Sequence, residues 1–234
     1  MKSPHKWRKR ILLMVLLLLL LCAGGFGFYV SDYYHADGSA LAVLDESGIT
    51  ADDDIIQLSP ASESNTAIVF YPGAKVEAEA YLPLLDQLRE NGFTCFLVKM
   101  PFNMAIFDSN AAADVITDHP EIQHWYIAGH SMGGAMASSF AADHSSDIDG
   151  LIQLGAYIYG DYPDNDTLTI YGSLNESVAE KITYDDNIVV IEGGNHAKFG
   201  NYGPQDGDKP AIISAEEQQK ETVDAMTAFI NQRA

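Results

Sequence analysis

The chain has 234 residues, of which 47% are hydrophobic and 10% aromatic, enough for one domain with a substantial core. It carries 13 Lys and Arg residues against 33 Asp and Glu residues, a formal net charge of −20. Nucleic-acid binding requires a basic face, so this charge excludes that class of protein. Two cysteines are too few for a disulfide scaffold.

The N-terminus combines a basic cluster with a long apolar run. Five of the 13 cations precede residue 11, namely Lys2, Lys6, Arg8, Lys9 and Arg10. Residues 11–30 carry no charge, and about 20 apolar residues suffice to cross a bilayer. Since basic flanks stay in the cytoplasm, the sequence predicts a cytoplasmic tail over 1–10, a single-pass transmembrane signal anchor over 11–30 and an extracellular body.

A cleaved signal peptide is the alternative interpretation of the same segment. Its most apolar part, residues 11–23, has the length of a signal-peptide core, and Cys22-Ala23-Gly24 offers small residues for cleavage. The body would then be secreted. The apolar run continues to Val30, which favours the uncleaved anchor in the cell membrane.

After a linker and lead-in over 31–51, apolar strand patterns alternate with helical patterns. We expect strands over 55–58, 67–71, 94–100, 125–129, 151–157, 168–172 and 188–194, and helices over 76–92, 109–120, 131–144 and 214–232. The first two strands flank a turn-rich segment, which predicts a hairpin. The alternation predicts an α/β domain over 52–234, with a mostly parallel sheet, helices on both faces and function at the carboxyl ends of the strands.

The strongest chemical motif is Gly129-His130-Ser131-Met132-Gly133, a G-x-S-x-G sequence. It follows the apolar strand 125–129 and opens a small-residue helix, as a nucleophile elbow requires. The two glycines allow strand and helix to approach closely. We therefore expect Ser131 to be a catalytic nucleophile exposed at the strand-to-helix turn.

A serine hydroxyl needs a base and an orienting acid to become a nucleophile. His196 follows the last strand in Gly193-Gly194-Asn195-His196, where a loop can carry it over the elbow. The chain order Ser, acid, His places the acid between them, and Glu176 is the first carboxylate after strand 168–172. An oxyanion hole would use the backbone N–H groups of Met132 and Ala74.

The chain resembles the α/β-hydrolase superfamily, and most closely its small bacterial dienelactone-hydrolase-like members. The resemblance covers about residues 52–232, and its motifs lie at 70–77, 98–101, 129–134 and 192–200. It implies a Ser-acid-His triad and ester-type hydrolysis. The sequence departs from the family pattern in two places: Pro72 stands where a histidine usually starts the oxyanion loop, and the usual aspartate after the seventh strand is not obvious.

The second departure leaves three candidates for the third triad position. With one inserted residue, the family pattern aligns its acid with Glu176, which we favour. Without a gap, the pattern leads from Gly172 to Asn175, whose amide orients an imidazole but cannot stabilise its charge. Asp161, after the strand 151–157, is the third candidate.

Together these features predict a membrane-anchored extracytoplasmic serine hydrolase. Its substrate would be a small-molecule carboxylic ester or thioester, cleaved through an acyl-enzyme. We expect no cofactor, no metal ion and a monomeric protein. Two other functions fit the same sequence: a catalytically inactive binding module at the cell surface, and an acyltransferase that uses the same triad.

Overall fold

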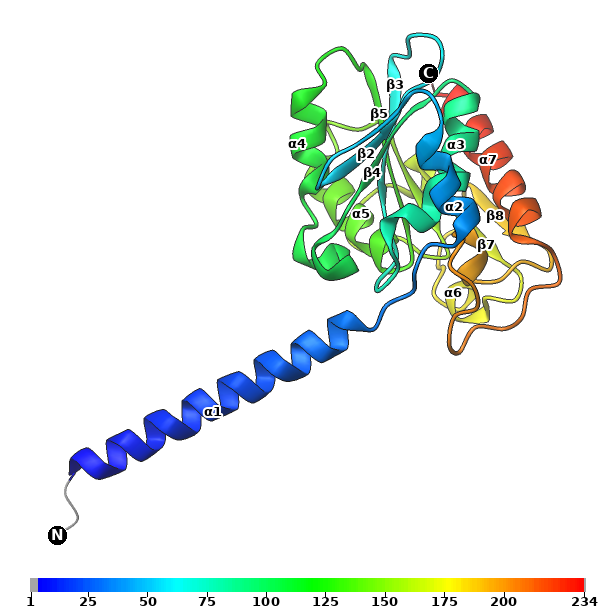
Figure 1. Cartoon of the computed structure of the whole chain (residues 1–234). Helices are drawn as coiled ribbons and strands as arrows, with labels where there is room; N and C mark the ends of the chain where they lie inside the picture. Colours follow the sequence, from blue (N-terminus) through cyan, green and yellow to red (C-terminus); the bar gives the residue numbers. More distant parts are fainter. Residues whose placement is uncertain (1–3, 234) are drawn as a thin grey trace. The chain divides into compact units, whose positions relative to one another are not determined.

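The structure is a computed structural model that describes residues 4–233. The chain forms two compact units, one that ends at Tyr33 and one that begins at Tyr34 (Figure 1). The second unit therefore includes residues of the segment that the sequence predicts to be a linker.

The first unit is one helix, α1 (Pro4–Ser31). Among the described residues, residues 7–31 form the one helix that is long and apolar enough to cross a membrane, with a mean hydropathy of 2.8. Its leucine side chains are exposed. This length and composition fit a membrane-spanning helix and also the hydrophobic segment of a signal sequence.

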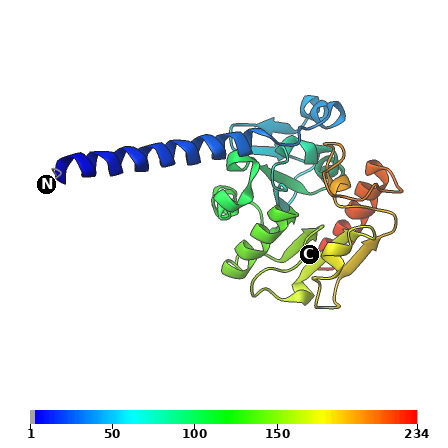
Figure 2. The same cartoon turned by 90° about the horizontal axis from the view of Figure 1, so that it is seen from below.

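The second unit is built on an eight-stranded sheet with the order β1-β2-β4-β3-β5-β6-β7-β8 (Figures 1 and 2). The strands are β1 (Ile49–Ala51), β2 (Ile55–Leu58), β3 (Thr66–Tyr71), β4 (Thr94–Val98), β5 (His124–His130), β6 (Gly150–Leu154), β7 (Thr167–Gly172) and β8 (Ile188–Ile191). The pairs β1–β2 and β2–β4 are antiparallel, and the other five pairs are parallel. The predicted α/β architecture with a mostly parallel sheet is confirmed.

Helices cover both faces of this sheet. The helices of this unit are α2 (Gly38–Ala42), α3 (Leu82–Glu90), α4 (Ala111–Asp118), α5 (Met132–Asp143), α6 (Glu176–Ala179) and α7 (Ala215–Asn231). Short 3-10 turns lie at Val43–Asp45, Ala78–Tyr81, Pro101–Asn103, Ala105–Phe107, Asp164–Asp166 and Ala197–Phe199. Helices α3 and α7 contribute side chains to one core cluster, and α4 and α5 to the other.

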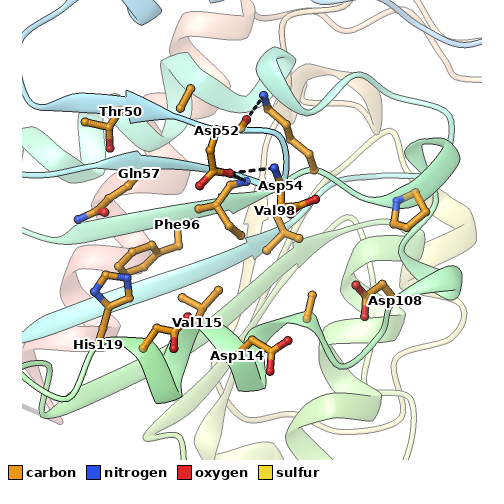
Figure 3. Close-up of a pocket in the computed structure, with 16 residues that line it drawn as sticks. Thr50, Asp52, Asp54, Gln57, Phe96, Val98, Asp108, Asp114, Val115 and His119 are labelled. Carbon is orange, nitrogen blue, oxygen red and sulfur yellow. Dashed lines mark hydrogen bonds between the residues drawn. The ribbon is translucent and has the colours of Figure 1, made fainter.

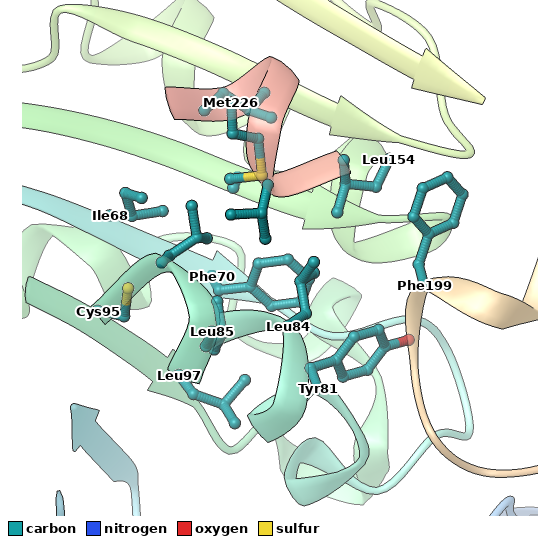
Figure 4. Close-up of a cluster of buried hydrophobic side chains, with 14 of the residues drawn as sticks. Ile68, Phe70, Tyr81, Leu84, Leu85, Cys95, Leu97, Leu154, Phe199 and Met226 are labelled. Carbon is teal, nitrogen blue, oxygen red and sulfur yellow. The ribbon is translucent and has the colours of Figure 1, made fainter. Parts of the chain in front are cut away.

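Strand β3 shows why the sequence forms a central strand. All six of its residues are buried, because successive side chains enter opposite clusters. Ile68 and Phe70 pack with α3 and α7 in the cluster of Figure 4, whereas Val69 and Tyr71 pack with α4 and α5. A continuous apolar run is therefore the pattern expected of a strand buried on both faces.

The predicted hairpin between residues 55–58 and 67–71 is wrong. Strand β2 pairs antiparallel with β4, with Ile56 opposite Leu97, while β3 lies between β4 and β5. The turn-rich segment shows correctly that the chain reverses its course, but it does not determine the neighbour. Both edges of β3 are taken by parallel strands, so β2 pairs one position further out.

Residues 34–51 of the predicted linker are part of the second compact unit. Besides α2 and β1, they include Tyr34, which forms a parallel bridge with Val76. The Tyr34 N–H donates to the Lys75 carbonyl at 2.7 Å, and the Glu77 N–H donates to the Tyr34 carbonyl at 2.9 Å. The compact unit thus begins 18 residues before the predicted boundary at residue 52.

Gly172, at the end of β7, offers a test of how tightly this fold packs. A Cβ at this position would overlap the backbone of Gly194 and meet Asn195 N at 2.5 Å. We expect Gly172→Ala to lower the free energy of unfolding by about 1–3 kcal/mol, because backbone atoms have to move. Gly38 in α2 has no atom within 4 Å of an added Cβ, so Gly38→Ala is the matched control. Thermal unfolding in detergent would contradict the packing if both variants were equally stable.

Candidate active site

Ser131 occupies a strained turn between the end of β5 and the start of α5. Its φ of 54° and ψ of −120° lie in a region that non-glycine residues rarely adopt. A Cβ at Gly129 would overlap the backbone of Gly133, so only glycine permits this close approach. The Ser131 N–H donates to the Leu154 carbonyl at 3.0 Å, which ties the turn to β6. This is the strand–turn–helix geometry that the motif predicts.

The start of α5 packs against the loop that follows β3. A Cβ at Gly133 would overlap the backbone carbonyls of Tyr71 and Pro72. Met132 is the first residue of α5, and Ala74 lies in the turn that follows Pro72. The packing therefore brings the helix N-terminus beside the loop that carries the second predicted oxyanion donor.

His196 lies in the loop after β8, directly before the 3-10 turn Ala197–Phe199. A Cβ at Gly155 would lie 3.0 Å from its Nδ1 atom, so the imidazole packs against the end of β6. The backbone N–H of Ser131 is hydrogen-bonded to the carbonyl of Leu154, the residue before Gly155. Both predicted reactive residues thus lie against the same strand end.

The side chain bonded to His196 is Asn175, whose Nδ2 atom lies 2.7 Å from the His196 Nδ1 atom. Asn175 is only 6% exposed, and it also accepts a hydrogen bond from Ser177 Oγ at 3.0 Å. Its backbone N–H donates to the Gly172 carbonyl at 2.8 Å. This turn presents residue 175 to the imidazole.

The structure does not bring the favoured acid, Glu176, to His196. Glu176 begins α6, is exposed, and forms an ion pair with Lys209 at 2.7 Å. Asp161 is exposed in the loop after β6. The physical reason is the turn closed by the Gly172 carbonyl: it directs residue 175 inward, so residue 176 faces solvent. The ungapped Gly172-to-Asn175 spacing is the signal that leads to the observed neighbour.

An amide beside the imidazole permits two proton arrangements. In the observed orientation Asn175 donates to Nδ1, which leaves the ring proton on Nε2. Rotating the amide by 180° lets its oxygen accept from Nδ1–H and frees Nε2 to accept a proton. A carboxylate would permit the second arrangement alone, which is the one that a base acting through Nε2 requires.

Burial and the carboxylate of Asp208 shift the pKa of His196 in opposite directions. Burial lowers the pKa of its imidazole below the ordinary value, and the negative charge of Asp208 partly offsets this. Asp208 accepts the backbone N–H groups of His196 at 3.2 Å and of Ala197 at 2.8 Å. The imidazole is therefore neutral at neutral pH, the form that can take a proton from a hydroxyl group.

A buried chain of hydrogen bonds runs through His130, and the sequence does not predict it. The Gly73 N–H donates to Tyr81 Oη at 3.1 Å, and Tyr81 Oη lies 2.7 Å from His130 Nδ1. His130 Nε2 lies 3.0 Å from the carbonyl oxygen of His196. Since a carbonyl oxygen can only accept, Nε2–H donates to it, and the unprotonated Nδ1 accepts the Tyr81 hydroxyl proton.

His130 is 1% exposed, and burial, followed by the proximity of His196, lowers its pKa well below 6.5. The neutral ring satisfies both nitrogens within the chain of bonds. The network therefore joins the loop after β3 to the backbone of His196. Nothing in the local motif signals it, because Tyr81 lies 49 residues before His130.

A cavity of about 530 Å³ lies elsewhere, between β1, β2, β4 and α4 (Figure 3). Its lining includes Asp52, Asp54, Asp108, Asp114 and Asp118, but none of the predicted site residues. Asp52 Oδ1 accepts the backbone N–H groups of Asp54 and Ile55 at 2.8 and 2.7 Å. Among the side chains that the structure describes, residues 7–233, no group of three or more His, Cys, Asp or Glu could hold a metal ion.

The pair Tyr81 and Tyr126 tests the buried network. Tyr81→Phe removes a hydroxyl that serves Gly73 and His130, whereas the buried Tyr126 hydroxyl has no hydrogen-bond partner among the described residues. We expect Tyr81→Phe to lower the free energy of unfolding by about 1–3 kcal/mol, because two buried polar groups are left unpaired. Tyr126→Phe should leave stability unchanged or slightly raise it. Equal losses in thermal unfolding would count against the network.

The chain is similar to a curated protein and to solved structures. "Putative non-heme haloperoxidase" of Mycobacterium phage D29 is 28% identical over 124 residues, 49% of this chain and 45% of that protein. The chain thus matches less than half the length of this curated relative.

Two solved structures illustrate the shared fold. A soluble variant of monoglyceride lipase from Saccharomyces cerevisiae has a TM-score of 0.54 and 11% identity, covering 81% of this chain and 96% of the lipase. A thermostable carboxyl esterase from Bacillus coagulans has a TM-score of 0.54 and 11% identity, covering 79% of this chain and 97% of the esterase.

The family comparison agrees with the fold. The profile of the alpha/beta hydrolase family matches residues 67–220, which is more than half of the chain and runs from β3 into α7. The protein therefore belongs to the alpha/beta hydrolase family.

Proposed function

We propose that this protein is a membrane-anchored serine hydrolase that cleaves a carboxylic ester or thioester through an acyl-enzyme. The observation that carries the proposal is the strained turn at Ser131, tied to the strand end against which His196 packs. Strain at a nucleophile is retained where the surrounding structure enforces it, as the glycine contacts do here. The esterase and lipase among the structural neighbours support hydrolysis as the reaction class.

In this mechanism His196 Nε2 takes the proton of Ser131 as Oγ attacks the carbonyl carbon of the substrate. The resulting oxyanion would be stabilised by the backbone N–H groups of Met132 and Ala74. The imidazolium then gives its proton to the leaving alcohol or thiol, and an acyl group remains on Ser131. Water, activated by the same imidazole, releases the acid and restores the serine. Nε2 is free to act as this base when the Asn175 amide is rotated so that its oxygen accepts from Nδ1–H, and in that arrangement Asn175 orients the ring.

The loop after β4 suggests an apolar substrate group. Phe102 is 52% exposed, and its ring lies edge-on to the half-exposed ring of Phe107, with centroids 5.5 Å apart. The neighbouring Asn103 carbonyl accepts the N–H of Lys75 at 2.7 Å, so this loop is joined to the loop that carries Ala74. Exposed aromatic rings beside the site favour an acyl chain or aromatic acid over a charged one.

One observation favours a second candidate, a catalytically inactive binding module. The residue bonded to His196 is an amide, and replacing the acid by an amide in a serine-protease triad cost about 10⁴ in kcat. A fluorophosphonate probe separates the candidates, because only an active serine reacts covalently. An acyltransferase would use the same residues and would be recognised by acyl transfer to an added alcohol.

Ser131 should carry the reaction. We expect wild-type protein to hydrolyse p-nitrophenyl esters and to be labelled by fluorophosphonate, and Ser131→Ala to lose both, with a decrease in kcat of up to about 10⁶. Ser145→Ala, at an exposed serine after α5, is the control and should retain activity. Glu176→Gln should also retain activity, since its carboxylate pairs with Lys209. Full activity in Ser131→Ala would refute the assignment of the nucleophile.

The basic flank over residues 1–10 leads us to propose that the catalytic unit is extracytoplasmic. Protease added to intact cells should therefore degrade the unit that begins at Tyr34, and the remaining fragment should stay in the membrane fraction. A cytoplasmic protein measured in the same cells controls for lysis. Protection in intact cells would contradict this orientation, and release of the whole unit into the medium would favour signal cleavage.

A further inference from the structure

Asp208 lies in the loop between β8 and α7, and both of its carboxylate oxygens bind the backbone next to the predicted base. One accepts the N–H of His196 at 3.2 Å, and the other accepts the N–H of Ala197 at 2.8 Å. The adjacent Lys209 carbonyl accepts a hydrogen bond from Asn195 Nδ2 at 2.8 Å. Three hydrogen bonds therefore fasten this loop to residues 195–197, and they hold the charge of Asp208 at a fixed place beside His196.

Among the described residues, the other groups around His196 supply no uncompensated negative charge. Asn175, bonded to Nδ1, is a neutral amide, and His130, whose ring centroid lies 4.6 Å away, is buried and neutral. The cation of the same turn, Lys198, donates to the Ile213 carbonyl at 2.7 Å. Glu176 is paired with Lys209, so these two charges largely cancel.

We propose that Asp208 is a positioning residue that supplies His196 with the negative charge which a triad carboxylate would otherwise provide, while Asn175 orients the imidazole. This inference rests on the proposed function. The proton of Ser131 moves to His196 and then to the leaving group, and Asp208 stays ionised throughout. Its charge stabilises the imidazolium that forms between these two transfers, and its two hydrogen bonds hold the backbone that carries the imidazole.

The test uses the full chain in detergent micelles and the dependence of kcat/KM on pH for a p-nitrophenyl ester. Asp208→Asn retains the size and one acceptor but removes the charge. The imidazolium is then less favoured, so the acid limb should move to lower pH by roughly half a unit, the shift that a unit charge several ångströms away causes when water screens it. The lost charge alone should lower kcat about threefold, the factor that corresponds to half a pKa unit.

Asn175→Asp provides the reciprocal test. A carboxylate at this position fixes the productive tautomer and adds a charge, so kcat should rise at least about tenfold and the acid limb should move to higher pH. Combined with Asp208→Asn, it should restore kcat to the wild-type level or above. If Asp208 only holds the loop, Asp208→Asn would lower kcat without moving the acid limb, and that result would overturn the proposal.

Two controls keep the test sharp. Asp206→Asn removes an exposed acid from the same loop and should leave the pH profile unchanged. If Asp208→Asn does not fold, Asp208→Glu keeps the charge and should keep the acid limb near its wild-type position; a shift to lower pH would contradict the proposal. Fluorophosphonate labelling of the wild type tests the proposed function separately. If the wild type is not labelled, both the serine-hydrolase function and the role of Asp208 are refuted. If it is labelled and Asp208→Asn keeps the wild-type pH profile, only the role of Asp208 is refuted.

Discussion

Close backbone approach at the carboxyl ends of the strands is the constraint on which the rest of this site depends. Gly129 and Gly133 allow α5 to start directly on β5, and Gly133 allows the same helix to press on the loop after β3. Gly172 plays the same part between β7 and the loop that leads to His196. Because no side chain fits at these contacts, the strained turn at Ser131, the loop with the predicted oxyanion donor Ala74 and the predicted base His196 are positioned by backbone packing as well as by side-chain hydrogen bonds.

Polar bonds then connect the pieces that this packing brings together. His130 is adjacent to Ser131 in sequence, but its side chain is buried. Its two ring nitrogens join Tyr81 to the carbonyl of His196. A protonated ring there would be a buried charge without a counterion, so the neutral form belongs to the folded state. Asn175 and Asp208 also contact His196, and in the proposed mechanism they share two tasks, orientation and charge, that a single carboxylate usually performs.

The sequence was sufficient for local features and insufficient for those set by distant contacts. Apolar runs, glycine spacing and chain order predicted the central strands, the turn at Ser131 and the loop position of His196. The predicted pairing of β2 is wrong because turn residues indicate that the chain reverses direction but do not indicate which strand pairs with β2. The favoured Glu176 differs from the observed Asn175 because one hydrogen bond, from the Asn175 N–H to Gly172, decides which residue of the turn faces inward. No local pattern predicts the Tyr81–His130 bond or the contact of Asp208 with residues 196 and 197.

The bridge between Tyr34 and Val76 limits how far the second unit can be shortened from its N-terminal side. Tyr34 exchanges backbone hydrogen bonds with Lys75 and Glu77, next to the turn that holds Ala74, and its hydroxyl accepts the N–H of Asp206 at 3.0 Å. It therefore contacts both the loop that holds Ala74 and the loop that carries Asp208. A shortened protein beginning at residue 52 would retain every predicted catalytic residue and still lose these contacts, together with α2 and β1. The smallest intact form of the second unit accordingly starts at Tyr34 or before it, a boundary set by two loops that lie far downstream in the chain.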